Sequence, residues 1–529
     1  MKKLFAAFIA LLTLFGAIAL SPNHANAASS QKEFRVAMEA AYPPFNWTQD
    51  TAANGAYPIE GSDQFANGYD VQVAKKLADK LGKKLVIVKS KWDGLIPALT
   101  SGKIDAIIAG MSPTPEREQS INFSTAYETG KMGVIVKKGS KYANATTIDD
   151  FSGAKITAQQ GTFHTDLIKQ LKGVSEQPAM NDFSAMRVAL SSGVIDGYVA
   201  ELVEGLTAEV KQPEFKFVDL SGKSGFEIDK SMMVCSVGLR KDDNSTLKTI
   251  NSYLKSWPKS EQDALMDSMV KLQSNPDKVT GFWSQVKFIW EQNWQHLLQS
   301  VGMTLLLSII GTIVGFGIGL LIGVFRTMNK ASNVLGRWLQ RIVGWLLNIY
   351  IEIFRGTPMM VQAMVIYYGS AQFLHLNIDR LFAAFLIVSI NTGAYMSEIV
   401  RGGIYSVDEG QFEAAHALGF THWQTMYKIV LPQAIRNILP SVGNEFVINI
   451  KDTSVLNVIS VSELYFMGNT IAQQNYQYFQ TFFIVSCIYL IMTFSITRIL
   501  RLIEHFLNRT SKTTMNPTQV TTGANQLQI

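Results

Sequence analysis

Long apolar segments alternate with short polar loops along the second half of the chain. Five segments are long enough to cross a bilayer, which takes about 20 apolar residues: approximately 301–325, 342–369, 381–399, 438–461 and 478–497. The first contains no charged residue and carries a smooth stripe where another helix can pack closely, formed by Gly311, Gly315, Gly319 and Gly323. The pattern predicts an all-α membrane domain with five spans, over 297–510.

Residues 32–271 show a different pattern of apolar and polar positions. Short β-branched runs such as 34–38 and 85–89 alternate with amphipathic helical patterns such as 71–81 and 95–101. This alternation predicts an α/β fold with central sheets. Its apolar runs are far shorter than a membrane span, so we expect this region to fold outside the bilayer.

The N-terminal segment, residues 1–27, has the order of a secretory signal. Two lysines precede an apolar run over 4–20, and Ala25-Asn26-Ala27 gives the small-x-small pattern of a cleavage site. We expect cleavage after Ala27. An uncleaved anchor helix is the alternative, although the run is short for a span.

The amino-acid composition indicates a membrane protein and argues against nucleic-acid binding, disulfides and metal sites. Of 529 residues, 47% are hydrophobic and 17% are charged, which is too apolar for a purely soluble chain. The net charge of +5 is not gathered into a patch, so we expect no nucleic-acid partner. Cys235 and Cys487 lie in different halves, and the histidines lack metal-ligand spacing, so neither a disulfide framework nor a metal site is expected.

Catalytic motifs are not apparent. Gly222-Lys223-Ser224 resembles the end of a phosphate-binding loop, but that loop needs glycine where this chain has Phe217. We therefore expect no catalytic residues, no cofactor and no ATPase activity in this polypeptide.

Loop charge predicts the orientation. Lysine and arginine concentrate between the first two apolar segments, around 401–436 and after the fifth. The positive-inside rule places these loops and the 511–529 tail in the cytoplasm, and residues 32–271 outside the cell. The connector 272–296 is rich in tryptophan and phenylalanine, which predicts a short helix over 281–296 lying on the outer leaflet. A solvated linker is the alternative.

A charged, amphipathic stretch, EAAHALGFTHWQTMYKIVLP, separates the third and fourth apolar segments at 413–432. Its pattern predicts a helix, a break at Gly419 and a second short helix stopped by Pro432. The order Glu-Ala-Ala, three residues, Gly, nine residues, Ile-x-Leu-Pro resembles the coupling loop of ABC-importer permeases. The resemblance implies that Glu413, Ala414, Ala415 and Gly419 contact a separate ATPase subunit. An ordinary cytoplasmic loop helix is the alternative.

Motifs in the 32–271 region occur in a characteristic order: Tyr42-Pro-Pro-Phe, Gly68-Tyr-Asp-Val, Lys91-Trp-Asp-Gly-Leu-Ile-Pro, Gly110-Met-Ser-Pro-Thr-Pro-Glu-Arg117, Gln160-Gly-Thr162 and Val237-Gly-Leu-Arg-Lys-Asp-Asp243. This order resembles the polar amino-acid family of periplasmic-type solute-binding proteins. The resemblance implies a type II fold of two α/β lobes that close on a ligand. Lobe 1 would comprise 33–126 and 235–271, and lobe 2 the interval between them.

The resemblance also assigns the groups that bind a free amino acid. Arg117 would bind the ligand carboxylate in a fork, with Ser112 and Thr162 adding hydroxyls and Gly110 leaving its backbone accessible. Glu201 falls where the family usually carries aspartate for the ligand ammonium. A surface helix carboxylate is the alternative for Glu201.

Three more positions concern the ligand side chain. Tyr42 and Trp92 would sandwich it, and Glu39 would approach its distal end. An acidic group between aromatic faces suits a cation, so we expect arginine, lysine or histidine. Glutamine is the alternative, since Glu39 could accept its amide hydrogens. Asp70 is expected to be structural.

Together, the resemblances imply a fused receptor and permease of an ABC importer for polar amino acids. We expect a homodimer in the cell membrane of a single-membrane bacterium, with two separate ATPase subunits that bind ATP and Mg²⁺. A ligand-gated channel would have its pore inserted between the lobe segments, whereas here all spans follow the binding region. A dehydratase on this fold would need neither spans nor a coupling loop.

Overall fold

A computed structural model of the chain describes residues 32–273, 281–374, 376, 378–475 and 477–509. The predicted signal segment and the 511–529 tail lie outside these residues. The chain divides into two compact units. The first comprises Met1–Leu307, Thr357–Ile387 and Thr453–Ser486, and the second comprises Ser308–Gly356, Val388–Asp452 and Cys487–Ile529.

Lobe 1 is built on a five-stranded sheet with the order β6-β1-β7-β14-β8. The strands are β6 (Lys84–Lys89), β1 (Glu33–Met38), β7 (Ala106–Ile107), β14 (Val234–Leu239) and β8 (Asn122–Thr129). Strands β6, β1 and β7 are parallel, and β14 runs antiparallel between β7 and β8. Because β14 comes from much later in the chain, the chain returns to this sheet after building the other lobe.

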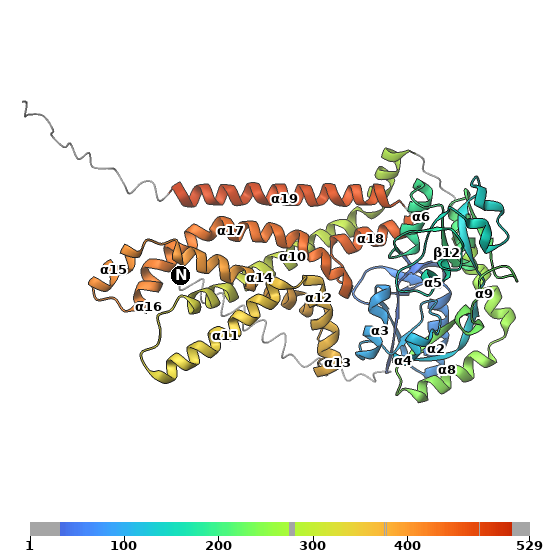
Figure 1. Ribbon diagram of the computed structural model, residues 1–529, viewed down its shortest axis with the longest axis horizontal. Helices are drawn as coiled ribbons and strands as arrows, with labels where there is room; N and C mark the ends of the chain where they lie inside the picture. The colour runs from blue at the N-terminus through green and yellow to red at the C-terminus, as the bar shows by residue number, and fades with distance from the viewer. Residues whose placement is uncertain (1–31, 274–280, 375, 377, 476, 510–529) are drawn as a thin grey trace, which may run out of the picture. The chain divides into compact units, whose positions relative to one another are not determined.

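Lobe 2 has its own five-stranded sheet, with the order β11-β10-β12-β9-β13. Its strands are β11 (Ser175–Glu176), β10 (Lys155–Thr157), β12 (Gly197–Glu201), β9 (Met132–Lys137) and β13 (Phe215–Asp219). The chain crosses between the lobes after β8 and again before β14. This is the two-lobed α/β architecture that the sequence predicts, and Figure 1 shows helices covering its sheets.

Several loops and helices around these sheets carry side chains that face the space between the lobes. In lobe 1 these are the short strand β2 (Ala41–Tyr42), helix α3 (Trp92–Thr100) and helix α4 (Pro115–Ser120), whereas helix α2 (Tyr69–Leu81) packs on β6. In lobe 2 they are α5 (His164–Ile168) and α6 (Phe183–Ser192), whereas α7 (Leu202–Lys211) packs on β13 and β12. Buried apolar side chains such as Val134, Ile156 and Val199 form the core of lobe 2.

The second half of the chain is helical (Figure 1). Its long helices are α10 (Phe282–Arg326), α11 (Val334–Gly356), α14 (Arg380–Tyr405), α17 (Leu431–Asp452) and α19 (Tyr478–Arg509). Among the described residues, α10, α14 and α19 are long and apolar enough to cross a membrane. Helices α11 and α17 each carry four charged side chains, and the predicted count of five spans is therefore not confirmed.

The predicted short helix over 281–296 is not a separate element. The structure has one helix of 45 residues, α10, that runs through this segment into the first apolar span. No glycine or proline lies between Phe282 and Val301, so nothing in the local sequence ends the helix there.

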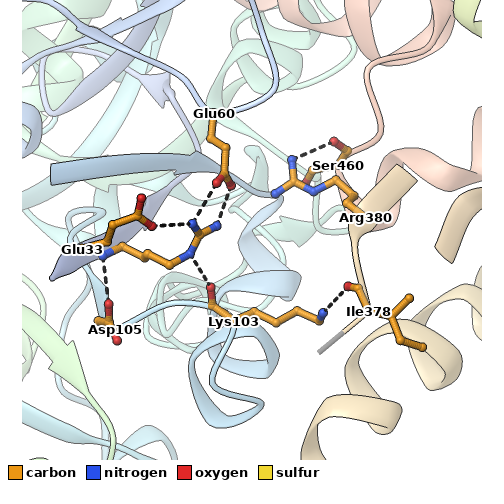
Figure 2. A network of polar contacts seen from close by, with 8 residues as sticks. Glu33, Glu60, Lys103, Asp105, Ile378, Arg380 and Ser460 are labelled. Carbon is orange, nitrogen blue, oxygen red and sulfur yellow. Dashed lines mark hydrogen bonds and ion pairs between the residues drawn. The ribbon is translucent and has the colours of Figure 1, made fainter. Parts of the chain in front are cut away.

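A network of polar contacts lies within the first compact unit (Figure 2). Arg35 forks onto Glu60 with Nη–Oε distances of 2.8 and 2.6 Å, and its Nε donates to the Lys103 carbonyl at 3.1 Å. Lys103 Nζ in turn donates to the carbonyl of Ile378, at 3.0 Å. Lobe 1 therefore contacts the segment that precedes α14.

The predicted glycine stripe on α10 packs against α14 in the second unit. A Cβ added at Gly319 would lie 2.4 Å from Met396 Cβ and 2.8 Å from the Ser397 backbone nitrogen. Added Cβ atoms at Gly311, Gly315 and Gly323 would lie 2.2 to 2.7 Å from side chains of α14. These distances are below contact distance, so the two backbones approach closely only because the side chains are absent.

Gly319→Ala should therefore destabilise the membrane half by about 1–3 kcal/mol, because the added methyl meets backbone atoms that cannot rotate away. Thermal unfolding of the purified full chain in detergent, followed by aggregation onset, measures the loss. Gly302→Ala is the matched control on the same helix, since nothing lies within 4 Å of the added Cβ. Equal stability of the two variants would contradict close packing at the stripe.

Candidate functional site

A cavity of about 310 Å³ lies between the two lobes. Its lining residues come from both lobes: Tyr42, Trp92, Gly110, Ser112, Arg117, Gln159, Thr162, Phe163, His164, Phe183 and Glu201. Seven of the eight residues that the sequence nominates for ligand binding line this cavity, and Glu39 does not. The structure therefore brings together one guanidinium, one carboxylate and several aromatic rings.

Arg117 spans the two lobes. Its Nη1 donates to the Ser112 carbonyl in lobe 1 at 2.9 Å, and its Nη2 donates to the Gly161 carbonyl in lobe 2 at 3.1 Å. Trp92 lies beneath it, with 5.1 Å from Arg117 Cζ to the ring centroid, and donates its indole N–H to the same Gly161 carbonyl at 3.2 Å. Burial lowers the pKa of Arg117 to about 10, which leaves it cationic at neutral pH and able to bind a carboxylate.

Gly110 adopts a conformation that places its backbone at the cavity wall. Its φ of +61° favours glycine, and an added Cβ would lie 3.1 Å from the Tyr42 ring. Its N–H donates to the Tyr127 hydroxyl at 3.0 Å, and this hydroxyl donates to Asp70 at 2.8 Å. Asp70 is fully buried and also accepts from Asn46 at 2.7 Å, so it supports the site from behind the wall.

Glu201 ends strand β12 at the opposite wall and is 8% exposed. The Tyr42 hydroxyl donates to one carboxylate oxygen, and His164 Nε2 lies 3.5 Å from the other. Burial alone would raise the pKa of Glu201, but His164, Tyr42 and Arg117 together outweigh it and lower that pKa. The carboxylate is therefore ionised and available to an ammonium group.

Glu39 lies next to the cavity but behind another side chain. Its carboxylate is 3.5 Å from the Gln159 amide nitrogen, and Gln159 lines the cavity. Glu39 itself lines a second cavity, of about 250 Å³, together with Lys89 and Lys91. Burial, with the nearby charge of Asp182, raises the pKa of Glu39 to about 8, so its carboxyl group is largely neutral at pH 7.

Sequence reasoning did not nominate four lining residues, Gln159, Phe163, His164 and Phe183. The first three flank the Gln160-Gly-Thr162 motif, so extending that motif by two residues on each side would have found them. Phe183 stacks on Tyr42 with ring centroids 4.6 Å apart and 16° between the planes. It begins α6, and no local pattern marks it as facing the other lobe.

The coupling stretch forms helix α15 (Glu409–Ala417), followed by Gly419 with φ +80° and a short helix α16 (His422–Thr425). Glu413 and Ala414 are exposed, whereas Ala415 is buried. The turn at Gly419 agrees with the prediction. Pro432 does not end the second helix, however, because a π-helical turn over 426–430 precedes it and Pro432 lies in the first turn of α17, where its missing N–H is tolerated.

Comparison with known proteins gives two family matches. Residues 34–269 match the bacterial extracellular solute-binding proteins of family 3, and residues 315–509 match the inner membrane component of binding-protein-dependent transport systems. The Escherichia coli K12 glutamine transport system permease protein is 39% identical over 41% of this chain and 97% of its own length. The nopaline transport system permease protein of Agrobacterium fabrum is 36% identical over 41% of this chain and 90% of its own length.

Solved structures similar to the chain include amino-acid-binding proteins. One is an amino-acid ABC transporter substrate-binding protein from Streptococcus pneumoniae bound to L-arginine. It is 24% identical, the match covers 46% of this chain and 96% of that chain, and the TM-score is 0.39. Another is an ancestral arginine-binding protein bound to glutamine. It is 28% identical, the match covers 46% of this chain and 98% of that chain, and the TM-score is 0.37.

Arg117→Ala should weaken amino-acid binding by about 2–3 kcal/mol, because a carboxylate closed between the lobes would lose its charged donors. Arg117→Lys should recover only part of this loss, since an ammonium cannot reproduce the fork. Calorimetry on the full chain in lipid nanodiscs, with glutamine and arginine as ligands, measures both. Lys172→Ala, on an exposed side chain of lobe 2, is the control, and wild-type affinity in Arg117→Ala would show that the ligand binds elsewhere.

Proposed function

Because this chain belongs to the amino-acid ABC permeases and carries a solute-binding domain in the same polypeptide, we propose that it captures a polar amino acid outside the cell and passes it to its own permease domain. The observation that carries this proposal is the inter-lobe cavity, where Arg117 and Glu201 offer opposite charges. A free amino acid presents a carboxylate and an ammonium on one carbon, which these two groups complement.

We further propose glutamine as the ligand. The zwitterion uses the charges of Arg117 and Glu201, and the remaining lining contains no other arginine, no lysine and no other carboxylate: Tyr42, Trp92, Gly110, Ser112, Gln159, Thr162, Phe163, His164 and Phe183. Glu39, which was expected to attract a cationic side chain, lies behind Gln159 and is largely neutral at pH 7. The similarity of the permease half to a glutamine permease supports the same ligand.

Arginine or lysine is the second candidate, and a specific observation favours it. The Glu39 carboxylate is only 3.5 Å from the Gln159 amide. A cationic side chain that displaced this amide would reach Glu39 and restore its charge, with Tyr42 and Trp92 on either side of the ligand stem. An acidic ligand would instead place two carboxylates together.

Transfer to the permease is supported by contacts within the first compact unit. On lobe 1, Lys89 Nζ donates to Thr470 Oγ1 at 2.7 Å. On lobe 2, Asp182 accepts from Gln473 Nε2 at 3.1 Å and from the Tyr478 hydroxyl at 3.0 Å. Thr470 and Gln473 both belong to α18 (Leu464–Asn475), which lies between the coupling stretch and the last long helix in the sequence. Both lobes are therefore hydrogen-bonded to residues of the permease half of the sequence.

The proposal also includes two kinds of partner, a second copy of this chain and separate ATPase subunits. ATP and Mg²⁺ bind to two separate ATPase subunits, which dock on the coupling stretch of a homodimer of this chain in the plasma membrane. The exposed Glu413 and Ala414 on α15, followed by the turn at Gly419, give that stretch an accessible face. Tethering the binding domain to the permease raises its local concentration, to about the millimolar range for a short linker.

Titration calorimetry of the full chain in nanodiscs should rank glutamine above arginine and lysine, with glutamate weakest. Glu39→Gln should change glutamine affinity by less than about 1 kcal/mol but weaken any cationic ligand by roughly 1.5–3 kcal/mol, since it removes the charge that a cation needs. Strong binding of arginine with none of glutamine would reverse the assignment. Glu33→Gln, on an exposed carboxylate at the start of β1, the strand that ends just before Glu39, controls for the loss of one negative charge.

Glu413→Lys should leave ligand affinity unchanged and abolish ligand-stimulated ATP hydrolysis, because the substitution reverses the charge offered to the ATPase. The assay uses the full complex purified from the native membrane and reconstituted in proteoliposomes. Glu409→Lys makes the same charge change one turn earlier on α15 and should retain most of the activity. A normal transport rate in Glu413→Lys would remove this residue from the coupling contact.

A further inference from the structure

The second cavity lies between lobe 1 and helix α18, within the first compact unit. Its lining includes six polar side chains, each between 2 and 8% exposed: Glu39, Lys89, Ser90, Asn469, Thr470 and Gln473. Buried polar groups are costly unless they meet hydrogen-bonding partners. A cavity with this lining therefore accepts a small polar molecule and disfavours an apolar one.

Lys89 fixes the two walls of this cavity relative to each other. Its Nζ donates to Thr48 Oγ1 of lobe 1 at 3.0 Å and to Thr470 Oγ1 of α18 at 2.7 Å. The same Nζ lies 5.2 Å from the ring centroid of Phe466, which supplies an apolar part of the lining. The cavity thus presents hydroxyl, amide and carboxyl groups at defined positions beside one aromatic face, which is the composition of a small-molecule site.

Gln159 and Glu39 stand between the second cavity and the inter-lobe cavity. Gln159 lines the inter-lobe cavity and Glu39 lines the second cavity. The Gln159 amide nitrogen lies 3.5 Å from the Glu39 carboxylate and 3.3 Å from the Asn181 carbonyl. Both distances exceed the usual range of about 2.7–3.2 Å for N–H···O bonds, so these contacts hold the amide weakly. Rotation of the Gln159 side chain to another rotamer would join the two cavities.

We propose that the second cavity is a transit site, where the amino acid that leaves the inter-lobe cavity binds on its way to the permease domain. This inference rests on the proposed function, since it takes the ligand of the inter-lobe cavity to be a free polar amino acid. The hydroxyl of Ser90 and the amides of Asn469 and Gln473 can hydrogen-bond to either end of the zwitterion and to a side-chain carboxamide. The ligand would thus exchange one set of polar partners for another as it reaches α18.

Asn469→Leu tests the transit site through uptake, because it removes one hydrogen-bonding amide from the lining with little change in volume. Glutamine uptake by the full complex in proteoliposomes should slow by about fivefold to tenfold, the effect of one lost hydrogen bond. Gln474→Leu makes the same kind of change on α18 outside the cavity lining and should keep the wild-type rate. Normal uptake in Asn469→Leu, or equal slowing in both variants, would overturn the transit site.

Thiol labelling detects the amino acid in the second cavity directly. The full chain in nanodiscs carries Asn469→Cys and reacts with methyl methanethiosulfonate, and the unsubstituted chain gives the background from Cys235 and Cys487. Glutamine at about ten times its dissociation constant should slow labelling by about tenfold, because bound ligand excludes the reagent. Ser90→Cys is a smaller change in the same lining and replaces Asn469→Cys if that variant does not fold. A thiol that fails to react without glutamine, or that reacts equally fast with it, would overturn the transit site.

Arg117→Ala, added to the labelled variant, separates a second site from an indirect effect of binding between the lobes. Arg117 lines the inter-lobe cavity and not the second cavity, so protection by glutamine should persist with the same midpoint. Protection that disappears together with inter-lobe binding would overturn the transit site and leave the proposed function standing. Absence of calorimetric glutamine, arginine and lysine binding in the unsubstituted chain would overturn the proposed function itself.

Discussion

The buried carboxylate of Glu201 is the charge on which the arrangement of the binding site depends. Removing a carboxylate from water is expensive, and polar side chains from both lobes lie against this one. Tyr42 comes from lobe 1, whereas His164 comes from lobe 2 next to the carboxylate itself. The contact from Tyr42 can exist only while the lobes are closed, so neutralising this one charge is linked to the conformation of the whole domain.

Arg117 makes the complementary link from the other side. Its guanidinium donates to carbonyls of Ser112 and Gly161, which belong to different lobes. A ligand carboxylate is a stronger acceptor than either carbonyl, because an ionised acceptor roughly doubles the strength of the hydrogen bond. A ligand carboxylate between the lobes would therefore bind Arg117 more strongly than the two carbonyls that the guanidinium contacts.

The sequence was informative where one short motif carries the chemistry, and less so where distant segments meet. Arg117, Trp92 and Glu201 all face one cavity, as their motifs suggest. Glu39 does not line it, because the side chain of Gln159 from the other lobe intervenes. No local sequence pattern of Glu39 or Gln159 indicates that the two side chains meet. The same is true of Phe183, because its stacking on Tyr42 depends on how the lobes close.

In the membrane half, the glycine period of α10 predicted close packing against a neighbour because it reflects a local steric property of one helix. The number of spans is a different kind of property. Apolar length alone suggested five, yet α11 and α17 combine apolar stretches with charged residues. Charged groups at membrane depth are tolerated when they face protein or water, which depends on neighbouring helices rather than on the segment itself.

Helix α18 shows how the binding domain and the permease sequence are physically connected. Thr470 contacts Lys89 of lobe 1, and Gln473, three residues later, contacts Asp182 of lobe 2. Residues three apart lie on the same face of a helix, one turn from each other. A rigid helical face of that size fixes the spacing between its two partners to within a few ångströms. Separation of the lobes would therefore break at least one of these contacts, so only a closed binding domain can satisfy both.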